Sequence, residues 1–291
     1  MVSKHKIEFI VFQSIGNIFA LFEFNSVKYS SKFIAFLSFY ILRVRRSVVI
    51  DNLTSAFPKL SSKEIKKLSY KNYKSIATTF LEIYILKKLS VEEIRQKFLD
   101  SGFDLIRKRF IENKGLILLT AHFGNWEMGA IASGIHLNEN INVLVKKQKN
   151  PFVAKWLVEF RERFGNKEIY LGTSVRELYK TIKNKKIVGV VGDQRGRRDG
   201  VNVLFFGRET KTFAGTASIA LKTKCPVFVL LCARTEDGTY KAIIKEINVD
   251  NFTGNKEEQI QQFNQEYMSI LEDAIVKYPE QWFWMHNIWK Y

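Results

Sequence analysis

The chain has 291 residues, with 46 Lys or Arg against 29 Asp or Glu, so its formal net charge is +17. Apolar residues make up 46% and aromatic residues 14%, which is enough to bury a sizeable core and excludes disorder of the whole chain. The length suits one large domain, or a core domain with an appended helical part. The two cysteines, Cys225 and Cys232, are too few for a disulfide framework and lack CxxC spacing for zinc.

The positive charge indicates an anionic partner. Nucleic acid, an anionic membrane face, and an acidic protein or substrate all fit it, and solubility alone is the simplest alternative. Basic residues are densest at 43–46, 63–74, 146–149 and 183–198, which predicts a one-sided basic surface. Each Lys or Arg near anionic lipid contributes about 1 kcal/mol, so a few of them would hold the chain on a bilayer.

Residues 1–113 are predicted to form a helical, membrane-associating region. The apolar run Ile7–Phe24 is interrupted by polar residues, and Phe33–Leu42 is short and ends at a cluster of arginines. No window of 18 uninterrupted apolar residues exists, so we expect amphipathic helices that lie in the membrane interface rather than a spanning helix. The alternative is that both segments pack on the domain core.

Further along the chain, helix signals give way to strand signals. Ser61–Glu64 is a capping box for a helix to about Leu89, and Ser90–Glu93 opens another helix. From residue 114 onward, short apolar runs alternate with helical stretches. The predicted strands are 116–120, 141–145, 187–191, 203–206, 227–233 and 240–247, and the predicted helices are 126–135, 151–164, 174–184, 214–222 and 256–278.

This alternation predicts an α/β fold with a mixed, mostly parallel sheet flanked by helices. The core would span residues 114–291 and form one integrated domain with the helical region. The sequence has no phosphate-binding GxxxxGK[ST], no GxGxxG after a strand, no GxSxG and no HExxH, so the common nucleotide-binding and serine-hydrolase functions lose their support.

One segment carries the residues for chemistry, from Thr120 to Glu127. His122 follows a predicted buried strand and precedes a helix, which is where open α/β sheets bind ligands. On one helix, His122 and Glu127 would lie about 140° apart, so we place His122 in the loop and Glu127 in the first helical turn. Gly124 would let the chain fold back, so that the carboxylate orients the imidazole and the other ring nitrogen acts as a base. The alternative is a structural His and a Glu favoured by the helix dipole.

Ala121–Glu127 resembles the HxxxxE motif of the bacterial late acyltransferases of lipid A biosynthesis, which are related to the HxxxxD glycerolipid acyltransferases. Other blocks are similar to that family in the same order, over about residues 40–291. These blocks are Val48–Pro58, Asn150–Trp156 followed by Arg161 and Arg163, Gly192–Gln194 with Phe205–Gly207 and Ala214–Gly215, and Pro279–His286.

The resemblance implies an O-acyltransferase that moves an acyl chain from a thioester to a hydroxyl of a lipid A precursor. His122 would be the general base, oriented by Glu127, with no metal and no cofactor beyond acyl carrier protein or coenzyme A as donor. Arg161 or Arg163 would stabilise the oxyanion, although both could lie on a solvated helix face. Further implied site residues are Asp193 and Gln194 near the substrate, and Gly124, Asn125, Trp126, Phe205, Phe206, Gly207 and Gly215 in the motif and acyl groove.

A few of these residues could serve the fold or a different ligand instead. Asp193 could simply form a turn, and Gly215 is expected to allow close backbone packing. The run Arg195–Arg198 could bind phosphates of the acceptor or the acidic helix of the carrier protein.

The implied partners are acyl carrier protein, an anionic membrane surface and a lipid A precursor, without nucleic acid. The implied location is the cytoplasmic face of the bacterial inner membrane, peripheral or weakly anchored. Where relatives have His-Arg-Arg, this chain has His286-Asn287-Ile288, so the acceptor could be another membrane lipid. More remote alternatives are a basic nucleic-acid-binding protein and a catalytically dead membrane scaffold.

Overall fold

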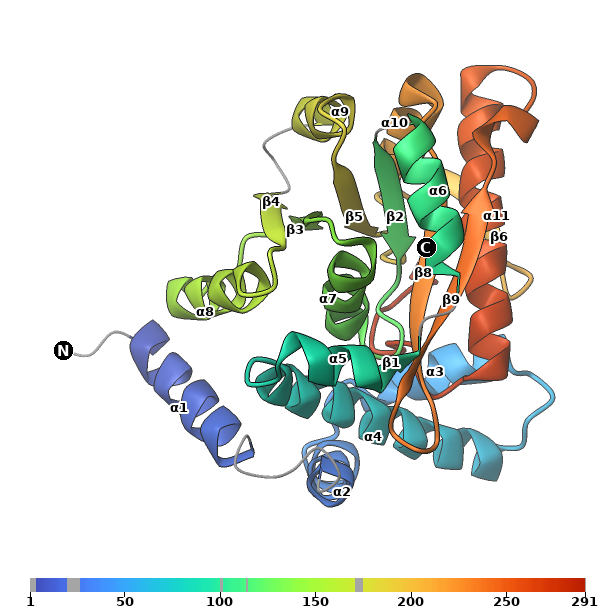
Figure 1. Ribbon diagram of the computed structural model, residues 1–291. Helices are drawn as coiled ribbons and strands as arrows, with labels where there is room; N and C mark the ends of the chain where they lie inside the picture. The colour runs from blue at the N-terminus through green and yellow to red at the C-terminus, as the bar shows by residue number, and fades with distance from the viewer. Residues whose placement is uncertain (1–3, 20–26, 100–101, 114, 171–174, 291) are drawn as a thin grey trace.

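The structure is a computed structural model that describes residues 4–19, 27–99, 102–113, 115–170 and 175–290. Its centre is a seven-stranded sheet in the order β1-β9-β8-β2-β5-β3-β4, beside a two-stranded sheet of β6 and β7 (Figure 1). The strands are β1 (Phe98–Leu99), β2 (Leu116–Thr120), β3 (Ile141–Val145), β4 (Lys167–Tyr170), β5 (Ile187–Val191), β6 (Val201–Phe205), β7 (Arg208–Thr212), β8 (Val227–Arg234) and β9 (Tyr240–Ile247).

Helices occupy most of the remaining chain. They are α1 (Lys4–Phe19), α2 (Val27–Phe36), the π-helix η2 (Leu37–Ile41), α3 (Arg46–Ala56), α4 (Ser62–Leu86), α5 (Val91–Lys97), α6 (Phe103–Asn113), α7 (Trp126–Leu137), α8 (Pro151–Glu162), α9 (Val175–Lys183), α10 (Gly215–Thr223), the 3₁₀ helix η3 (Val249–Asn251) and α11 (Lys256–Lys277).

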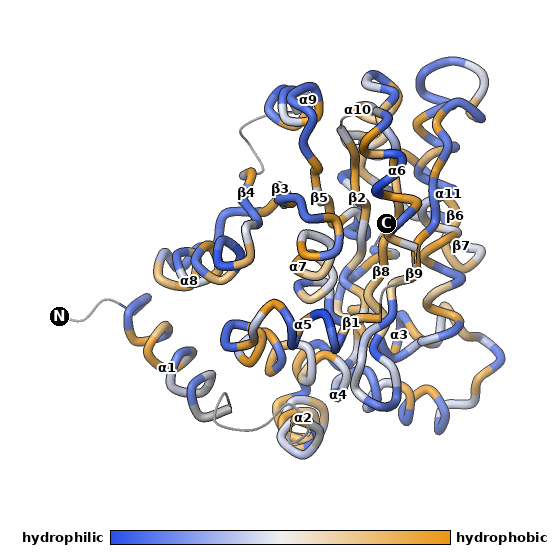
Figure 2. The backbone as a smooth tube through the Cα atoms, in the orientation of Figure 1, coloured by the Kyte–Doolittle hydropathy of each residue, from blue (hydrophilic) through white to orange (hydrophobic). Residues whose placement is uncertain are grey.

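The central strands are buried on both faces, and their side chains alternate between two hydrophobic clusters. In β2, Ile117 and Leu119 pack in the cluster that contains α10 and α11 residues, whereas Leu116 and Leu118 pack in the cluster of α5, α6 and α7. Successive residues of β8 alternate between the same two clusters. Figure 2 shows the hydrophobic character of these strands. Burial on both faces explains their continuous apolar runs.

Parallel pairing brings the carboxyl ends of three strands together. β2 pairs in parallel with β5 on one side and with β8 on the other. The residues that follow β2 and β5, and the last residue of β8, therefore meet at one edge of the sheet. Only β9 runs antiparallel to its neighbour β8 among the described strands of this sheet.

The predicted α/β class with a mostly parallel sheet is confirmed, and β2, β3, β5 and β9 have the predicted bounds. Three strands were missed: β1, β4 and β7. Each of β1 and β4 is short and lies at an edge of the sheet, so neither carries an apolar run. The strand expected at 203–206 is β6, which ends at Phe205 and pairs with β7 outside the main sheet. A domain boundary near residue 114 stays a prediction, and β1, from the helical region, pairs with β9.

The predicted run 7–24 forms α1 as far as Phe19 and lies partly outside the described residues, whereas the run Phe33–Leu42 covers the end of α2, the π-helix η2 and Leu42. α2 packs on α4, on the side away from the sheet (Figure 1). None of the helices that the structure describes combines the length and the apolarity needed to span a bilayer.

Candidate active site

A tight loop after β2 presents His122 at the carboxyl edge of the sheet. Gly124 has φ +57°, and a Cβ there would lie 1.8 Å from the carbonyl oxygen of Cys232, so only glycine fits this approach. The side chain of Asn125 then caps α7 by accepting a hydrogen bond of 3.0 Å from the Met128 N–H. The loop thus joins a buried strand to a capped helix.

His122 is paired with Asp193, the second residue after β5. The Nδ1 atom of His122 lies 2.8 Å from Asp193 Oδ1, and the backbone N–H of His122 donates to Asp193 Oδ2 at 2.8 Å. Trp282 Nε1–H also donates to Oδ2, at 2.9 Å. Asp193 is 1% exposed, so its carboxylate is removed from water and fixed by three hydrogen bonds. Nδ1 of the ring carries the proton when His122 is neutral, because a carboxylate only accepts.

The electrostatics of the pair favour a charged imidazole. Burial opposes the charge, but the Asp193 carboxylate, its hydrogen bond and the more distant Glu127 charge together raise the pKa of His122 above 6.5. Burial likewise works against ionised Asp193, yet the charge and hydrogen bond of His122 leave the pKa of Asp193 lowered. Such an imidazole can take up a proton and keep it in place.

A second charged cluster lies near His122, around Arg161 of α8. Its guanidinium donates Nε–H to Glu127 Oε2 at 3.1 Å, a second N–H to Glu127 and another to Glu168 of β4. The side chains of Arg161 and Glu127 are 12% and 10% exposed. This cluster holds one fixed positive charge between two carboxylates.

His122 and the three members of the Arg161 cluster line one cavity of about 540 Å³. Its walls come from α4, β3, α7 and α8, and most of the lining side chains are apolar. Among them are Phe80, Ile83, Leu118, Val143, Leu144, Trp156 and Leu157, with His122, Glu127 and Arg161 supplying polar groups. A cavity of this volume and lining suits a flexible apolar chain that carries a polar reacting end.

A family model described as bacterial lipid A biosynthesis acyltransferase matches residues 3–291. The chain belongs to this family. It is 24% identical over 257 residues to the lipid A biosynthesis lauroyltransferase of Escherichia coli K12, an alignment that covers 87% of this chain and 82% of that protein. It is 22% identical over 252 residues to the palmitoleoyltransferase of lipid A biosynthesis from the same organism, covering 86% and 80%. It is also 24% identical over 183 residues to a phosphatidylinositol mannoside acyltransferase of Mycolicibacterium smegmatis, covering 60% and 57%.

In this acyltransferase the predicted partner of His122 is wrong. We expected Glu127 to orient the ring, but the carboxylate on Nδ1 belongs to Asp193, whereas Glu127 pairs with Arg161. The reason is the strand order: β5 lies directly beside β2, so the residue after β5 reaches the loop after β2. Glu127 sits in the first turn of α7 and influences His122 only through its charge.

The two arginines proposed for the oxyanion have different positions. Arg161 lines the cavity, as the oxyanion role requires. Arg163 is exposed, donates Nη2–H to the carbonyl of Leu89 at 3.1 Å and stacks on Phe164. It is absent from the cavity lining found among the described residues, which favours Arg161 of the two alternatives.

Of the other residues predicted near the substrate or in the acyl groove, some line the cavity and others do not. Trp126 and Gln194 line the cavity. Phe205 and Phe206 do not. Phe205 is fully buried, with its ring 5.4 Å from that of Trp282, and Phe206 packs against Trp284.

The two glycines of these blocks have different surroundings from those we expected. Gly207 forms the two-residue turn between β6 and β7 with Phe206, both at positive φ. Gly215 begins α10, and a Cβ there would meet nothing within 4 Å, so the predicted close packing at Gly215 is wrong.

Two other residues near His122, Trp282 and His286, had no site role assigned in the sequence analysis. The ring of His286 lies 5.2 Å from that of His122, and burial lowers the pKa of His286 to about 4. Its Nε2 atom is buried without a hydrogen-bond partner among the described residues. Pro279–His286 resembled a family block, which marked the segment but assigned no role to Trp282 or His286. In the same described part of the chain, no group of three or more His, Cys, Asp or Glu could hold a metal ion.

Proposed function

We propose that this family member transfers a fatty acyl chain from an acyl thioester, carried by acyl carrier protein, to a hydroxyl of a lipid A precursor. One observation carries the proposal: His122, with Nδ1 fixed on a buried carboxylate, lies in the lining of a mostly apolar cavity. Its Nε2 has no hydrogen-bond partner among the described residues, so this nitrogen is available for a substrate hydroxyl.

The proposed chemistry uses His122 as general base and then general acid. Nε2 removes the proton of the acceptor hydroxyl while its oxygen attacks the thioester carbonyl carbon. The tetrahedral intermediate collapses with cleavage of the C–S bond, and the imidazolium returns the proton to the departing thiolate. Asp193 stabilises the charged ring during this cycle. General acid–base catalysis of this kind contributes typically about 10²–10⁴-fold.

Arg161 is our candidate for stabilising the negative charge on the intermediate. A guanidinium has five N–H donors, and three of those on Arg161 are used by Glu127 and Glu168. Arg161 lines the cavity, so its remaining N–H donors and its fixed positive charge are placed to act on an intermediate formed there. The acyl chain would occupy the apolar part of the cavity, where each buried methylene contributes about 0.8 kcal/mol.

A second candidate is acyl transfer to another membrane lipid. Two observations favour it. The chain is also similar to an acyltransferase named for a phosphatidylinositol mannoside, and it has His286-Asn287-Ile288 near its end instead of the His-Arg-Arg expected for lipid A enzymes. Mass spectrometry of lipids from a deletion strain separates the two, because only the first predicts under-acylated lipid A.

We further propose peripheral attachment to the cytoplasmic face of the bacterial inner membrane. Phe33, Phe36, Ile41 and Leu42 on α2, η2 and the residue after it are 48–68% exposed, and three arginines follow within residues 43–46. Apolar side chains beside basic ones suit insertion into an anionic interface. Phe80 of α4, the helix on which α2 packs, is half exposed and lines the cavity, so the cavity has an apolar side chain that reaches solvent.

The test is an assay with purified protein, acyl carrier protein thioesters of several lengths and an under-acylated lipid A precursor. We expect transfer that collapses in His122→Ala while circular dichroism and the melting temperature show an intact fold. A parent protein that transfers no acyl chain to any precursor hydroxyl would contradict the proposal. Loss in Glu127→Ala is also expected, through the Arg161 cluster rather than through orientation of the ring.

A further inference from the structure

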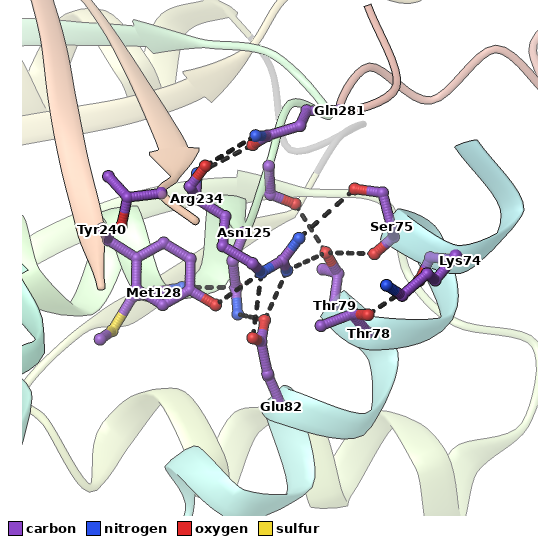
Figure 3. A network of polar contacts seen from close by, with 12 residues as sticks. Lys74, Ser75, Thr78, Thr79, Glu82, Asn125, Met128, Arg234, Tyr240 and Gln281 are labelled. Atoms are coloured by element: carbon purple, nitrogen blue, oxygen red, sulfur yellow. Dashed lines mark hydrogen bonds and ion pairs between the residues drawn. The ribbon is translucent and has the colours of Figure 1, made fainter. Parts of the chain in front are cut away.

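A buried ion pair lies behind the His122 loop, on the side of α4. Arg234, the last residue of β8, donates Nη2–H to Glu82 Oε2 at 2.6 Å and Nε–H to Oε1 at 3.1 Å (Figure 3). The side chains are 13% and 2% exposed. Neither residue lines the cavity found among the described residues, so neither contacts a ligand bound there.

Both members of the pair hold the loop through one intermediate side chain each. Glu82 Oε2 accepts a hydrogen bond from Asn125 Nδ2 at 3.0 Å, which fixes the residue that caps α7. Arg234 donates to the hydroxyl of Thr79 at 2.9 Å, and that hydroxyl lies 2.7 Å from the Gly124 carbonyl. Thr79 has one proton to donate, and the carbonyl of Ser75 is more distant at 3.2 Å. The proton therefore goes to Gly124.

A third connection runs through the C-terminal segment. The Gln281 side chain accepts from the Arg234 backbone N–H and donates to its carbonyl, both at 2.8 Å. The carbonyl of Gln281 accepts from Gly124 N–H at 2.9 Å, and Phe283 N–H donates to the His122 carbonyl at 2.9 Å. Between them, Trp282 donates to Asp193. Gly124 is thus tied to Arg234 through Gln281, and the two residues after Gln281 hold Asp193 and His122.

The energetics argue against stability as the reason for this arrangement. Desolvation of two charges generally cancels their attraction, so apolar residues of similar volume would serve a core equally well or better. What apolar residues could not supply is the acceptor for Asn125 and the donor to Thr79. We propose that Glu82 and Arg234 are positioning residues that set the His122 loop in the geometry needed for acyl transfer.

This inference rests on the proposed function, and its main test is the double variant Glu82→Met with Arg234→Met. We expect this protein to fold, because the charges are removed together, with a melting temperature lowered by the loss of the acceptor for the buried Asn125 amide. Transfer should fall by roughly 10- to 100-fold in kcat with KM for the acyl donor within about two-fold, because small displacements of a catalytic group are costly. The pH profile of kcat/KM should also move as the His122–Asp193 contact loosens.

The matched control is Arg109→Met with Glu246→Met. This ion pair joins α6 to β9, with Arg109 Nε 2.8 Å from Glu246 Oε1, and has no contact with the His122 loop among its described bonds. We expect kcat and the pH profile of this control to match the parent.

A smaller change keeps the test decisive if the double variant does not fold. Thr79→Val keeps the shape of the side chain but removes the donor to Gly124, whereas Thr79→Ser keeps the hydroxyl. We expect kcat to fall about 10-fold in Thr79→Val and to recover in Thr79→Ser.

A readout independent of activity separates this inference from the proposed function. In protein labelled with ¹⁵N-histidine, the His122 ring, assigned by its loss in His122→Ala, should show a shifted resonance and titration in Thr79→Val but not in Thr79→Ser. A parent without transfer activity overturns the proposed function, while these spectra still report on the loop. Unchanged His122 resonances together with kcat within two-fold of the parent in Thr79→Val would overturn the positioning role.

Discussion

His122 and Arg161 line the same cavity, and each is paired with buried carboxylate, Asp193 for His122 and Glu127 and Glu168 for Arg161, yet the two groups differ in what they can do. The imidazole can change its charge, with its pKa raised by Asp193, and its Nε2 has no hydrogen-bond partner among the described residues. The guanidinium cannot titrate and uses three of its donors on Glu127 and Glu168. We infer that one pair exchanges a proton and the other holds a fixed charge, and the following variants test that division.

The largest effect is expected from His122→Ala. Removal of the imidazole abolishes the proposed proton transfer, so kcat for acyl transfer should fall by about 10²–10⁴-fold. The measurement is initial rate with saturating acyl thioester, with circular dichroism as the check on folding. A folded variant that keeps more than a tenth of parental kcat would assign the chemistry elsewhere.

Asp193→Asn should have the next largest effect, about 10²-fold in kcat. The Asp193 charge raises the pKa of His122, so the variant should have a lower His122 pKa. A general base works when neutral, and kcat/KM of the parent should therefore rise through a pKa above 6.5. In Asp193→Asn this acid limb should move to lower pH. A limb that stays in place would mean that His122 does not control it.

The sequence predicted the residue types of the site better than their partners. His122 was recognisable because a buried strand, a glycine turn and a capped helix surround it within twelve consecutive residues. Each of these features is encoded by neighbouring residues in the sequence. Asp193 was recognisable as a polar residue at the carboxyl end of a strand. Its pairing with His122 depends on β5 lying beside β2, and no local pattern records strand order.

The residues that were missed depend on contacts between distant parts of the chain. Glu82 and Arg234 lie 152 residues apart in sequence, and Trp282 reaches Asp193 across 89. Glu82 is one polar position in an amphipathic helix, and Arg234 ends an apolar strand, so each fits its local pattern without any role at the site. Phe205 and Phe206 show the opposite error, since their apolar character fits a groove as well as the core in which they pack.

Glu127→Gln tests the Arg161 cluster through a smaller effect on the same acid limb of the kcat/KM profile. The Glu127 charge raises the pKa of His122, but by less than Asp193 does. The acid limb of the kcat/KM profile should therefore move to lower pH by less than in Asp193→Asn, with kcat reduced about 10-fold. Glu168→Gln is the matched control, because Glu168 shares Arg161 but does not contribute to the His122 pKa. Each variant leaves Arg161 with one carboxylate, and both should melt at lower temperature than the parent. Equal limb shifts in the two variants would contradict a specific influence of Glu127.

The smallest effect on rate is expected from Trp282→Phe. Phenylalanine fills most of the indole volume but cannot donate to Asp193 Oδ2, so one bond to a charged group is lost, at a typical cost of about 1.5–3 kcal/mol of folding free energy. Asp193 Oδ1 still holds the ring of His122, and kcat should fall by less than about 10-fold, with the acid limb displaced slightly.

Trp284→Phe is the control for Trp282→Phe, because Trp284 is equally buried, packs on Trp282 at 4.6 Å and donates to the Pro279 carbonyl instead. Denaturant unfolding should show a loss of stability in both variants, smaller in Trp284→Phe because its acceptor is neutral, while only Trp282→Phe changes the pH profile. If the two variants have the same pH profile, the Trp282 indole N–H contributes to stability alone and does not affect the pKa of His122.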